Sequence, residues 1–196
     1  MMQLIIVSGL IGSGKSTVST LLKKKGFYYL NADNIAKKLL VTNNEIKIKL
    51  LDFFDKDILY RNKISVHKIR EKLLKSKKNR DYINKTIHPI FFSYINKEIK
   101  KIKRSSLVLE LPLIETVKKI SIPFKIVTID SSFNKRLSRC LKSKKFSQKE
   151  FIRLDKVQRK RSFYIKNSDY ILVNNDTINT LKNKFEELYL TKILKK

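Results

Sequence analysis

The residues best suited to chemistry in this chain form one glycine-rich stretch near its start, Gly9-Leu10-Ile11-Gly12-Ser13-Gly14-Lys15-Ser16-Thr17. The spacing G-x-x-x-x-G-K-S is that of a phosphate-binding loop, or P-loop. Glycines let such a loop curl until its backbone N–H groups converge on an anion. Lys15 would add a positive charge for the β- and γ-phosphates, and Ser16 would add a hydroxyl ligand for Mg²⁺. We therefore predict that ATP binds to Gly12, Ser13, Gly14, Lys15, Ser16 and Thr17.

The segments on both sides of the P-loop support this interpretation. Leu4-Ile5-Ile6-Val7 is a short run rich in β-branched residues, typical of a strand buried on both faces. Val18, Leu21 and Leu22 are spaced as one face of a helix. A glycine-rich turn that matched the pattern by accident would not have both flanks. The sequence therefore predicts a strand, a P-loop and a helix in succession.

Two carboxylates are candidates for the remaining chemistry of phosphoryl transfer. Asp33 follows a second predicted strand, Phe27-Tyr28-Tyr29-Leu30, and should lie at the same sheet edge as the P-loop. It could orient an acceptor hydroxyl and take its proton, help to hold a metal-bound water, or serve as the N-cap of the next helix. Glu110 follows a third predicted strand and could hold Mg²⁺ through a water molecule. Its alternative role is that of a solvated strand-end residue.

Two basic stretches, Lys142–Lys145 and Gln158–Arg161, are candidates for a lid that closes on ATP. The second lies within a predicted helix that runs from Phe151 to Ile165. In so basic a chain, both stretches could equally be ordinary solvated surface. The lid is therefore one of two open interpretations.

The order of the elements predicts an α/β fold, a three-layer α/β/α structure with a five-stranded parallel sheet. The third, fourth and fifth strands are expected at Leu107–Leu109, Ile126–Ile129 and Ile171–Val173. Gly26 is placed as the residue that ends the first helix. The last helix is expected to be capped by Asp176 and to bury Ile178, Leu181, Phe185 and Leu188.

Between the second and third strands, the pattern is helical and contains no convincing strand. Ile46, Leu50 and Phe53 fit one helix, and Val66, Ile69 and Leu73 fit another behind a Ser65 N-cap. A third extends through Phe91, Ile95, Ile99 and Ile102. A crossover needs far fewer residues. We expect one domain over residues 1–196, with a core of 1–34 and 105–196, a lid at about 142–162, and a helical acceptor-binding insertion at 35–104.

The composition is strongly basic, with 45 Lys and Arg against 17 Asp and Glu and a formal charge of +28. The lysines are spread through nearly every segment, which favours compositional bias over a specific nucleic-acid site. No apolar run is long enough to span a bilayer, and the first strand begins too early for a signal peptide. The single cysteine, Cys140, is consistent with a reducing compartment. We expect a cytoplasmic protein, and the sequence carries no indication of oligomeric state.

Several motifs of the chain stand in the order and at the spacing typical of one known family. The P-loop of the chain, with Ser8 before it, is similar to the family's T-G-G-I-G-S-G-K-S, and Asn31-Ala32-Asp33 takes the place of D-A-D. The pair His88-Pro89, which we expect to open the long helix of the insertion, matches a His-Pro pair of the family. Glu110-Leu111-Pro112-Leu113-Ile114-Glu115 is similar to D-V-P-L-L-x-E. Further similarities to a lid helix and a strand lie at Phe151–Gln158 and Ser168–Ile171. On these motifs the sequence resembles the dephospho-CoA kinase family.

The resemblance implies ATP-dependent phosphorylation of the ribose 3′-hydroxyl of dephospho-CoA, which yields CoA and ADP in the last step of CoA biosynthesis. Asp33 would be the catalytic carboxylate, assisted by Lys15, and Mg²⁺ would be held by Ser16 and Glu110. The acceptor would contact Asp33, His88, Pro112 and Glu115, although His88 could instead be a helix-start residue. The lid would use Arg139, Lys142, Lys144 and Arg161.

Two positions depart from the family pattern. Asn31 replaces the first acidic residue of D-A-D, and Ser143 lies where the family commonly has a lid arginine. A lysine nearby could supply the charge but not the planar fork of arginine. The alternatives to this family are another P-loop kinase of nucleosides or nucleoside monophosphates and, in a different class, a nucleic-acid-associated P-loop protein.

Overall fold

A computed structural model of the chain describes residues 3–102, 106–144 and 146–194. It contains two compact units. The P-loop unit comprises residues 1–30, 104–118 and 122–196, and the helical unit comprises residues 31–103 and 119–121. The predicted division into a core, an insertion and a lid stays a prediction.

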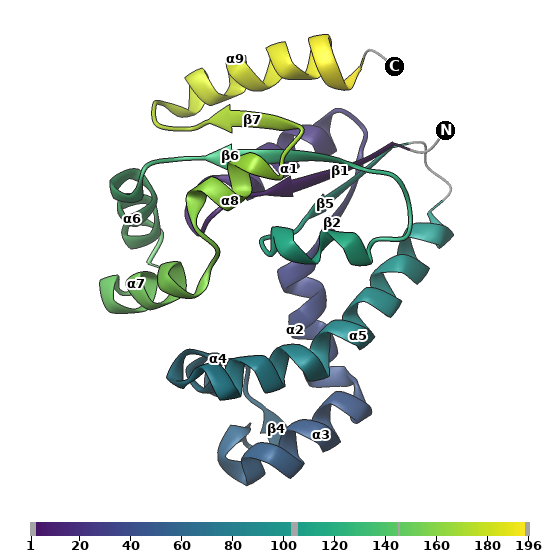
Figure 1. Cartoon of the computed structure of the whole chain (residues 1–196), viewed down its shortest axis with the longest axis vertical. Coiled ribbons are helices and arrows are strands. Elements are labelled where there is room, and N and C mark those ends of the chain that lie inside the picture. Colours follow the sequence, from purple (N-terminus) through teal and green to yellow (C-terminus); the bar gives the residue numbers. More distant parts are fainter. Residues whose placement is uncertain (1–2, 103–105, 145, 195–196) are drawn as a thin grey trace. The chain divides into compact units, whose positions relative to one another are not determined.

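The P-loop unit is built on a five-stranded parallel sheet, as predicted (Figure 1). Its strands stand in the order β2-β5-β1-β6-β7, so the P-loop strand β1 is central. Parallel pairing places Val7 of β1 opposite Glu110 of β5 on one side and Val127 of β6 on the other. The strands are β1 (Gln3–Ser8), β2 (Tyr28–Asn31), β5 (Ser106–Glu110), β6 (Lys125–Asp130) and β7 (Tyr170–Val173).

One face of this sheet packs against α1 (Lys15–Lys24) and α9 (Ile178–Leu188). The shared core includes Val18 and Leu22 of α1 and Leu181 and Phe185 of α9. Figure 1 shows α8 (Arg161–Lys166) in front of β6, while α1 lies behind the strands. The remaining elements of this unit are α6 (Phe133–Lys142), α7 (Gln148–Val157) and the π-helical turn η3 (Tyr189–Ile193). The 3₁₀-helix η2 (Ile114–Lys119) also belongs to it, except for its last residue, Lys119, which belongs to the helical unit. The central strands are therefore buried on both faces, which explains their continuous apolar runs.

The predicted helix from Phe151 to Ile165 is wrong, because the chain forms α7 and α8 with a break between them. Gln158, just after α7, has extended backbone angles of φ −79° and ψ 163°. Its side chain accepts a hydrogen bond from the Ile11 N–H of the P-loop, 2.8 Å away. Arg161, the first residue of α8, binds the Asp130 carboxylate at the end of β6. These contacts join residues far apart in sequence, and a helical periodicity does not reveal them.

The predicted cap of α9 is also wrong. Thr177 is the N-cap, since its hydroxyl accepts a hydrogen bond from the Thr180 N–H at 3.2 Å. Asp176 instead pairs with Lys184 at 3.1 Å. Ile178 is 53% exposed rather than buried. The helix therefore buries a narrower face than its apolar residues suggest.

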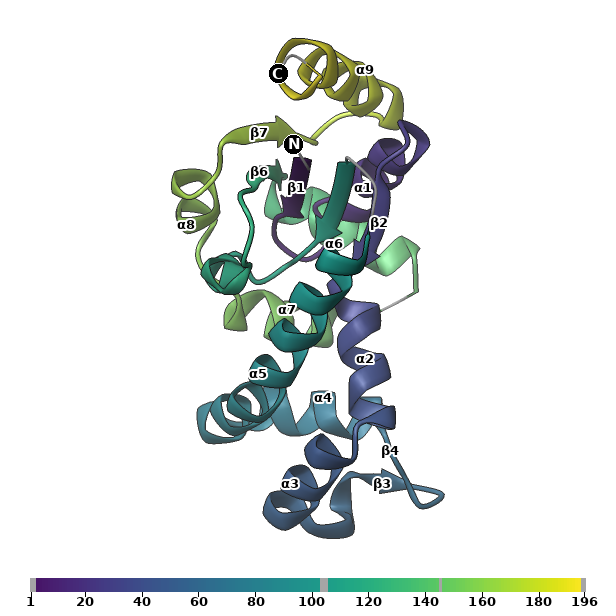
Figure 2. The same cartoon turned by 90° about the vertical axis from the view of Figure 1, so that its right-hand side faces the viewer.

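The helical unit contains α2 (Ala32–Thr42), α3 (Asn44–Phe54), α4 (Val66–Lys75) and α5 (Lys77–Lys101), with 3₁₀-helix η1 (Asp55–Ile58) after α3. Ser65 caps α4, as predicted. The prediction that this part has no strand is wrong, because β3 (Leu59–Tyr60) and β4 (Lys63–Ile64) form an antiparallel hairpin (Figure 2). Its turn residues Arg61 and Asn62 both have positive φ. Two-residue strands are too short to show an alternating pattern.

Pro89 does not open the long helix of this unit. It lies inside α5, whose N-cap is Ser76, the acceptor of a hydrogen bond from the Asn79 N–H. Proline inside a helix removes one backbone hydrogen bond and crowds the preceding turn. Here buried side chains continue on both sides of Pro89, including Ile83 before it and Ile95 after it. Packing therefore stabilises the part of α5 that precedes Pro89, although proline disfavours a helix at that point.

The described residues include no helix that combines the length and the apolar character needed to cross a bilayer.

Candidate active site

The P-loop runs from the end of β1 to the start of α1, in the predicted strand–loop–helix order. Its three glycines all have positive φ, with 139° at Gly9, 75° at Gly12 and 105° at Gly14. Gly14 is also the N-cap of α1. The first-turn N–H groups of α1 therefore follow directly on the loop, and a helix N-terminus favours bound phosphate.

Gly14 is enclosed by Asn174, which follows β7. The Asn174 side-chain amide donates to the Ser13 carbonyl at 2.7 Å. A Cβ atom on Gly14 would lie 2.4 Å from the nitrogen of that amide. The loop thus needs glycine here for its conformation and for the space that Asn174 occupies.

Gly14→Ala is expected to weaken ADP binding strongly and to lower the free energy of unfolding by about 1–3 kcal/mol from the positive φ alone. Gly26→Ala is the matched control, because Gly26 also has a positive φ of 92°, but a Cβ atom added there would meet nothing within 4 Å. It should cost stability and leave ADP affinity unchanged. Thermal unfolding and ADP titration measure the two effects. Normal ADP binding by Gly14→Ala would contradict this account of the loop.

Lys15 and Ser16 stand at the first two positions of α1. The Lys15 ammonium donates to the Leu10 carbonyl across the loop, 3.0 Å away. Ser16 is exposed, and its hydroxyl is therefore accessible to a ligand. Thr17 donates its backbone N–H to the Gly14 carbonyl, which closes the first turn. The assignment of these residues to ATP stays a prediction.

Glu110 ends β5, in register with Val7 near the end of β1. It is only 8% exposed, so the alternative of a solvated strand-end residue is wrong. Its Oε2 accepts a hydrogen bond from the Tyr29 hydroxyl of β2 at 2.5 Å. A charge-assisted bond of this kind fixes a carboxylate in position. Glu110 is thus a held carboxylate beside the P-loop strand.

Asp33 lies in the first turn of α2, two residues after the end of β2, and is exposed. It does not cap the helix, because Asn31 does: the Asn31 Oδ1 accepts from the Asn34 N–H at 2.9 Å. The interpretation of Asp33 as an N-cap is therefore wrong. The departure of Asn31 from the acidic pattern also has a structural role, since asparagine is a favoured N-cap.

Two of the four predicted lid residues have well-defined partners. The Arg139 guanidinium donates to the Ser131 hydroxyl and to both oxygens of Asn174. Partial burial lowers the pKa of Arg139 from its usual value. Arg161 forms a two-point ion pair with the buried Asp130, and this pair raises the pKa of Arg161. Lys142 and Lys144 are exposed at and just after the end of α6, and Lys145 of the same basic stretch lies outside the described residues.

Sequence reasoning missed three side chains that contact the P-loop. Asn174 and Arg136 donate to loop carbonyls, and Gln158 accepts from a loop N–H. The sequence marks Gln158 only as part of a basic stretch, although it is itself uncharged. Asn174 stands directly after a predicted strand, which is the one signal that could have marked it.

Two predicted acceptor residues, Pro112 and Glu115, lie in the P-loop unit. The Pro112 carbonyl accepts a hydrogen bond from the Tyr164 hydroxyl at 3.0 Å. Burial raises the pKa of Tyr164 well above its usual value. Glu115, in η2, lies 3.7 Å from Arg159, and its Oε2 is buried without a hydrogen-bond partner. A buried carboxylate oxygen without a partner is costly and marks a place where a ligand could donate a hydrogen bond.

The third predicted acceptor residue, His88, lies in the helical unit on α5, so its role as a helix-start residue is excluded. Its ring meets the Phe92 ring edge-on, with centroids 6.0 Å apart. Burial lowers the pKa of His88 from 6.5, and the positive charge of Lys119 lowers it further. The folded protein therefore favours a neutral imidazole at this position.

This pKa shift predicts a pH dependence of stability. Since the folded state binds the proton less readily than the unfolded state, the free energy of unfolding should fall as pH decreases from about 7.5 to about 5. His88→Gln should reduce this fall, and His67→Gln, at the exposed second histidine, should not. Urea unfolding at several pH values measures the difference. An unchanged pH slope in His88→Gln would show that His88 does not contribute.

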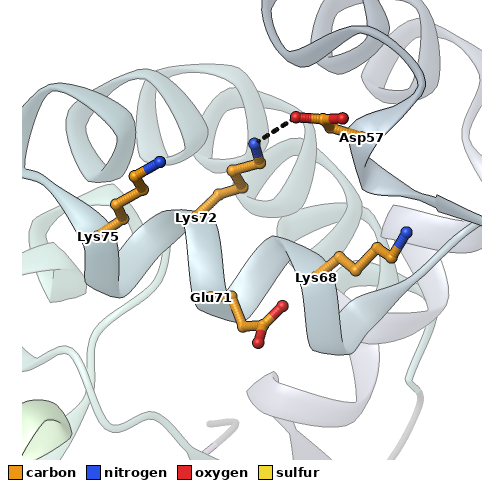
Figure 3. Close-up of a pocket in the computed structure, with 5 residues that line it drawn as sticks. All are labelled: Asp57, Lys68, Glu71, Lys72 and Lys75. Carbon is orange, nitrogen blue, oxygen red and sulfur yellow. Dashed lines mark hydrogen bonds and ion pairs between the residues drawn. The ribbon is translucent and has the colours of Figure 1, made fainter.

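A surface pocket of about 280 Å³ lies in the helical unit, lined by Asp57, Lys68, Glu71, Lys72 and Lys75 (Figure 3). The Lys72 ammonium binds the Asp57 carboxylate at 3.0 Å and lowers the pKa of Asp57. Lys68 donates to a backbone carbonyl. Three lysines and two carboxylates leave a modest positive charge, and none of the predicted acceptor residues lines the pocket.

Comparison with known proteins identifies the family of P-loop proteins to which the chain is similar. The family model described as dephospho-CoA kinase matches residues 3–180. The chain belongs to the dephospho-CoA kinase family. A dephospho-CoA kinase from Leptospira interrogans is 28% identical over 190 residues, which cover 96% of this chain and 92% of the relative. One from Carboxydothermus hydrogenoformans is 29% identical, with 92% and 90% covered. The predicted resemblance and the predicted class, a kinase, are confirmed.

Solved structures agree on the fold. A dephospho-CoA kinase from Campylobacter jejuni superposes with a TM-score of 0.70 at 20% identity, covering 99% of this chain and 100% of that one. A protein from Thermus thermophilus gives a TM-score of 0.79 at 18% identity, with 97% and 98% covered. A shikimate kinase from Acinetobacter baumannii reaches 0.55 at 15% identity, with 100% of this chain and 96% of that one covered. At these identities the structural likeness supports the P-loop kinase fold.

Proposed function

We propose that this dephospho-CoA kinase family member transfers the γ-phosphoryl group of ATP to the ribose 3′-hydroxyl of dephospho-CoA, giving CoA and ADP. The observation that carries the proposal is the family match over residues 3–180. It extends from β1, through the helical unit, to the first residues of α9. The match therefore covers most of the P-loop unit and the whole described part of the helical unit.

The donor side rests on the P-loop. Its backbone N–H groups and the N-terminus of α1 favour the β- and γ-phosphates, and Lys15 adds a charge that can follow the transferred group. Asn174 and Arg136 donate hydrogen bonds to the loop, and Gln158 accepts one from it, so the loop is held in advance. Phosphoryl transfer depends mainly on positioning and electrostatic stabilisation, which such a loop provides.

The acceptor side rests on Asp33, with His88, Pro112 and Glu115 as further candidates. A carboxylate that accepts the proton of the attacking hydroxyl makes the oxygen a better nucleophile. Asp33 is exposed and does not have the capping role that Asn31 fills. The unpartnered Oε2 of Glu115 would accept a hydrogen bond from the acceptor.

Mg²⁺ fits the oxygen donors of the P-loop unit. It prefers oxygen ligands and is usually held by one or two protein groups together with substrate phosphates and water. The exposed Ser16 hydroxyl would be a direct ligand, and Glu110, fixed by Tyr29, would act through a water. The ion would neutralise charge that develops on the phosphates.

The positive charge of the chain suits two anionic substrates, since a basic surface raises the rate of encounter with anions. We expect the enzyme in the cytoplasm, with no membrane and no specific nucleic acid as a partner. Arg139, Lys142, Lys144 and Arg161 remain the proposed lid residues, and Arg139 is held at several points by its hydrogen bonds.

The test is to incubate the protein with MgATP and one acceptor and to follow ADP. Dephospho-CoA should be consumed with formation of CoA. CoA itself is the matched control, because its 3′-hydroxyl is already phosphorylated, and it should give no turnover. Turnover of a nucleoside monophosphate in place of dephospho-CoA would instead favour the alternative P-loop kinase.

RNA is the third arm of this experiment. A nucleic-acid-associated protein should bind RNA with an affinity that falls steeply as salt is added, through counterion release. RNA-dependent ADP formation without turnover of dephospho-CoA would overturn the proposal.

A further inference from the structure

The tip of the P-loop is tied to two neighbouring helices through the peptide groups of a single residue, Ile11. Its N–H donates to the Gln158 Oε1 at 2.8 Å, and its carbonyl accepts from the Arg136 guanidinium at 3.2 Å. Gln158 follows α7 and Arg136 lies in α6, 147 and 125 residues away in the sequence. Both polar groups of one loop residue are thus held by side chains from elsewhere.

Arg136 is buried in the interior of the P-loop unit. It is 4% exposed, and its guanidinium also donates to Asp155 of α7 at 2.5 Å and to the Ser131 carbonyl at 3.2 Å. The centroids of the Phe133 and Phe151 rings lie 5.7 Å from it. A buried guanidinium with this many partners has little freedom to move, so it can act as a fixed reference for the loop.

Backbone packing adds to this restraint. A Cβ on Gly12 would lie 2.6 Å from the Arg136 carbonyl and 2.9 Å from the Cys140 sulfur, so the loop tip rests directly on α6. In Figure 1, α6 and α7 are neighbours at the end of β6. The loop tip, α6 and α7 therefore form one hydrogen-bonded assembly within the P-loop unit.

This assembly addresses an energetic difficulty of glycine-rich loops. Such a loop is flexible, and ordering it when a nucleotide binds costs conformational entropy. Contacts that hold the loop before binding reduce that cost and raise affinity without touching the nucleotide.

We propose that Arg136 and Gln158 are positioning residues for the donor nucleotide, which act by fixing the Ile11 peptide and so presetting the P-loop. The proposal concerns how the proposed function's donor, ATP, is bound. It rests on the proposed function in one respect, that the P-loop binds ATP. The proposal does not depend on which acceptor the enzyme phosphorylates.

Gln158→Met tests the first contact, because methionine has a similar shape and offers no oxygen to the Ile11 N–H. The dissociation constant for MgADP should rise about three- to tenfold, because this is the change in affinity that corresponds to the net free energy of one hydrogen bond. Amide hydrogen exchange in residues 9–14 should become faster in the nucleotide-free protein. KM for ATP should rise and KM for dephospho-CoA should not.

Gln148→Met is the matched control, since Gln148 is the exposed first residue of α7. It should leave ADP affinity and loop exchange unchanged. Gln158→Glu keeps an acceptor oxygen, so it should retain slow exchange in the loop even where its added charge weakens ADP binding. A role in stability alone would lower the melting temperature of the Met variant without affecting loop exchange.

Arg136→Lys tests the second contact. Removing the charge altogether would leave Asp155 unpaired and could unfold the protein, whereas lysine keeps the charge and loses the fork. ADP binding should weaken by about threefold or more, while Arg153→Lys, at an exposed arginine of α7, should show no change.

The proposal is overturned if Gln158→Met and Arg136→Lys both bind MgADP as the unchanged protein does, with unchanged loop exchange. ADP titration and hydrogen exchange need no acceptor. A failure of dephospho-CoA as a substrate would therefore contradict the proposed function and leave this result standing.

Discussion

Asp33→Asn is expected to lower kcat by about 100-fold or more while ATP affinity stays nearly unchanged, as for loss of a positioned general base. Asparagine keeps the size of the side chain and its ability to accept a hydrogen bond, but it cannot take a proton from the acceptor hydroxyl. Steady-state kinetics with dephospho-CoA and an ADP titration measure the two quantities separately.

A smaller structural effect must be separated from this one. Asp33 lies in the first turn of α2, where a negative charge stabilises the helix dipole by about 0.3–1 kcal/mol. Asp33→Asn should therefore lower the melting temperature slightly, and the assay temperature must lie well below it. Asp52→Asn is the control, because Asp52 is exposed on α3 of the same unit. It should be fully active.

Near-normal turnover by Asp33→Asn would show that the carboxylate is not the base. Helix capping would not then be its explanation, because Asn31 occupies that role. The first-turn charge would be the remaining function of Asp33.

The centre of the sheet could be predicted well because its central strands are buried on both faces. Runs such as Ile5-Ile6-Val7 and Leu107-Val108-Leu109 contain no polar residue, and each of these residues is 0% exposed in the structure. Local sequence is sufficient where every position has the same environment. The P-loop could be predicted for a related reason, since its glycines and Lys15 act through local backbone geometry.

The errors arise where contacts between distant residues decide the local structure. The break between α7 and α8 depends on Gln158 and Arg161, whose partners Ile11 and Asp130 lie in other parts of the chain. Pro89 is tolerated in α5 because side chains on both sides of it are buried. Local rules for helices contain neither kind of contact, and packing outweighs propensity in both cases.

The residues of the candidate site also fall into two groups, those that local sequence predicts and those that only contacts in the folded chain reveal. Lys15, Ser16 and Asp33 could be selected from residue type and strand order. Arg136 could not, because an arginine in a chain with 45 basic residues carries no signal of its own. Its burial and its hydrogen bonds to the P-loop and α7 distinguish it, and these are properties of the folded chain.

Lys15→Ala is expected to damage nucleotide binding and catalysis together, with a fall in kcat/KM of about 100-fold or more, since the ammonium interacts with the phosphates before and during transfer. The lost hydrogen bond to the Leu10 carbonyl should also loosen the loop. ADP titration and initial rates at saturating dephospho-CoA measure the two losses.

Lys24→Ala provides the control, because it removes the same charge from the exposed far end of α1. If attraction by the overall charge of the chain explained nucleotide binding, the two variants would lose affinity equally, and both effects would shrink as salt is added. A large loss of ADP affinity in Lys15→Ala alone, which persists at high salt, would show that the position of the ammonium in the loop matters. The other lysines of the chain would then not be able to replace it.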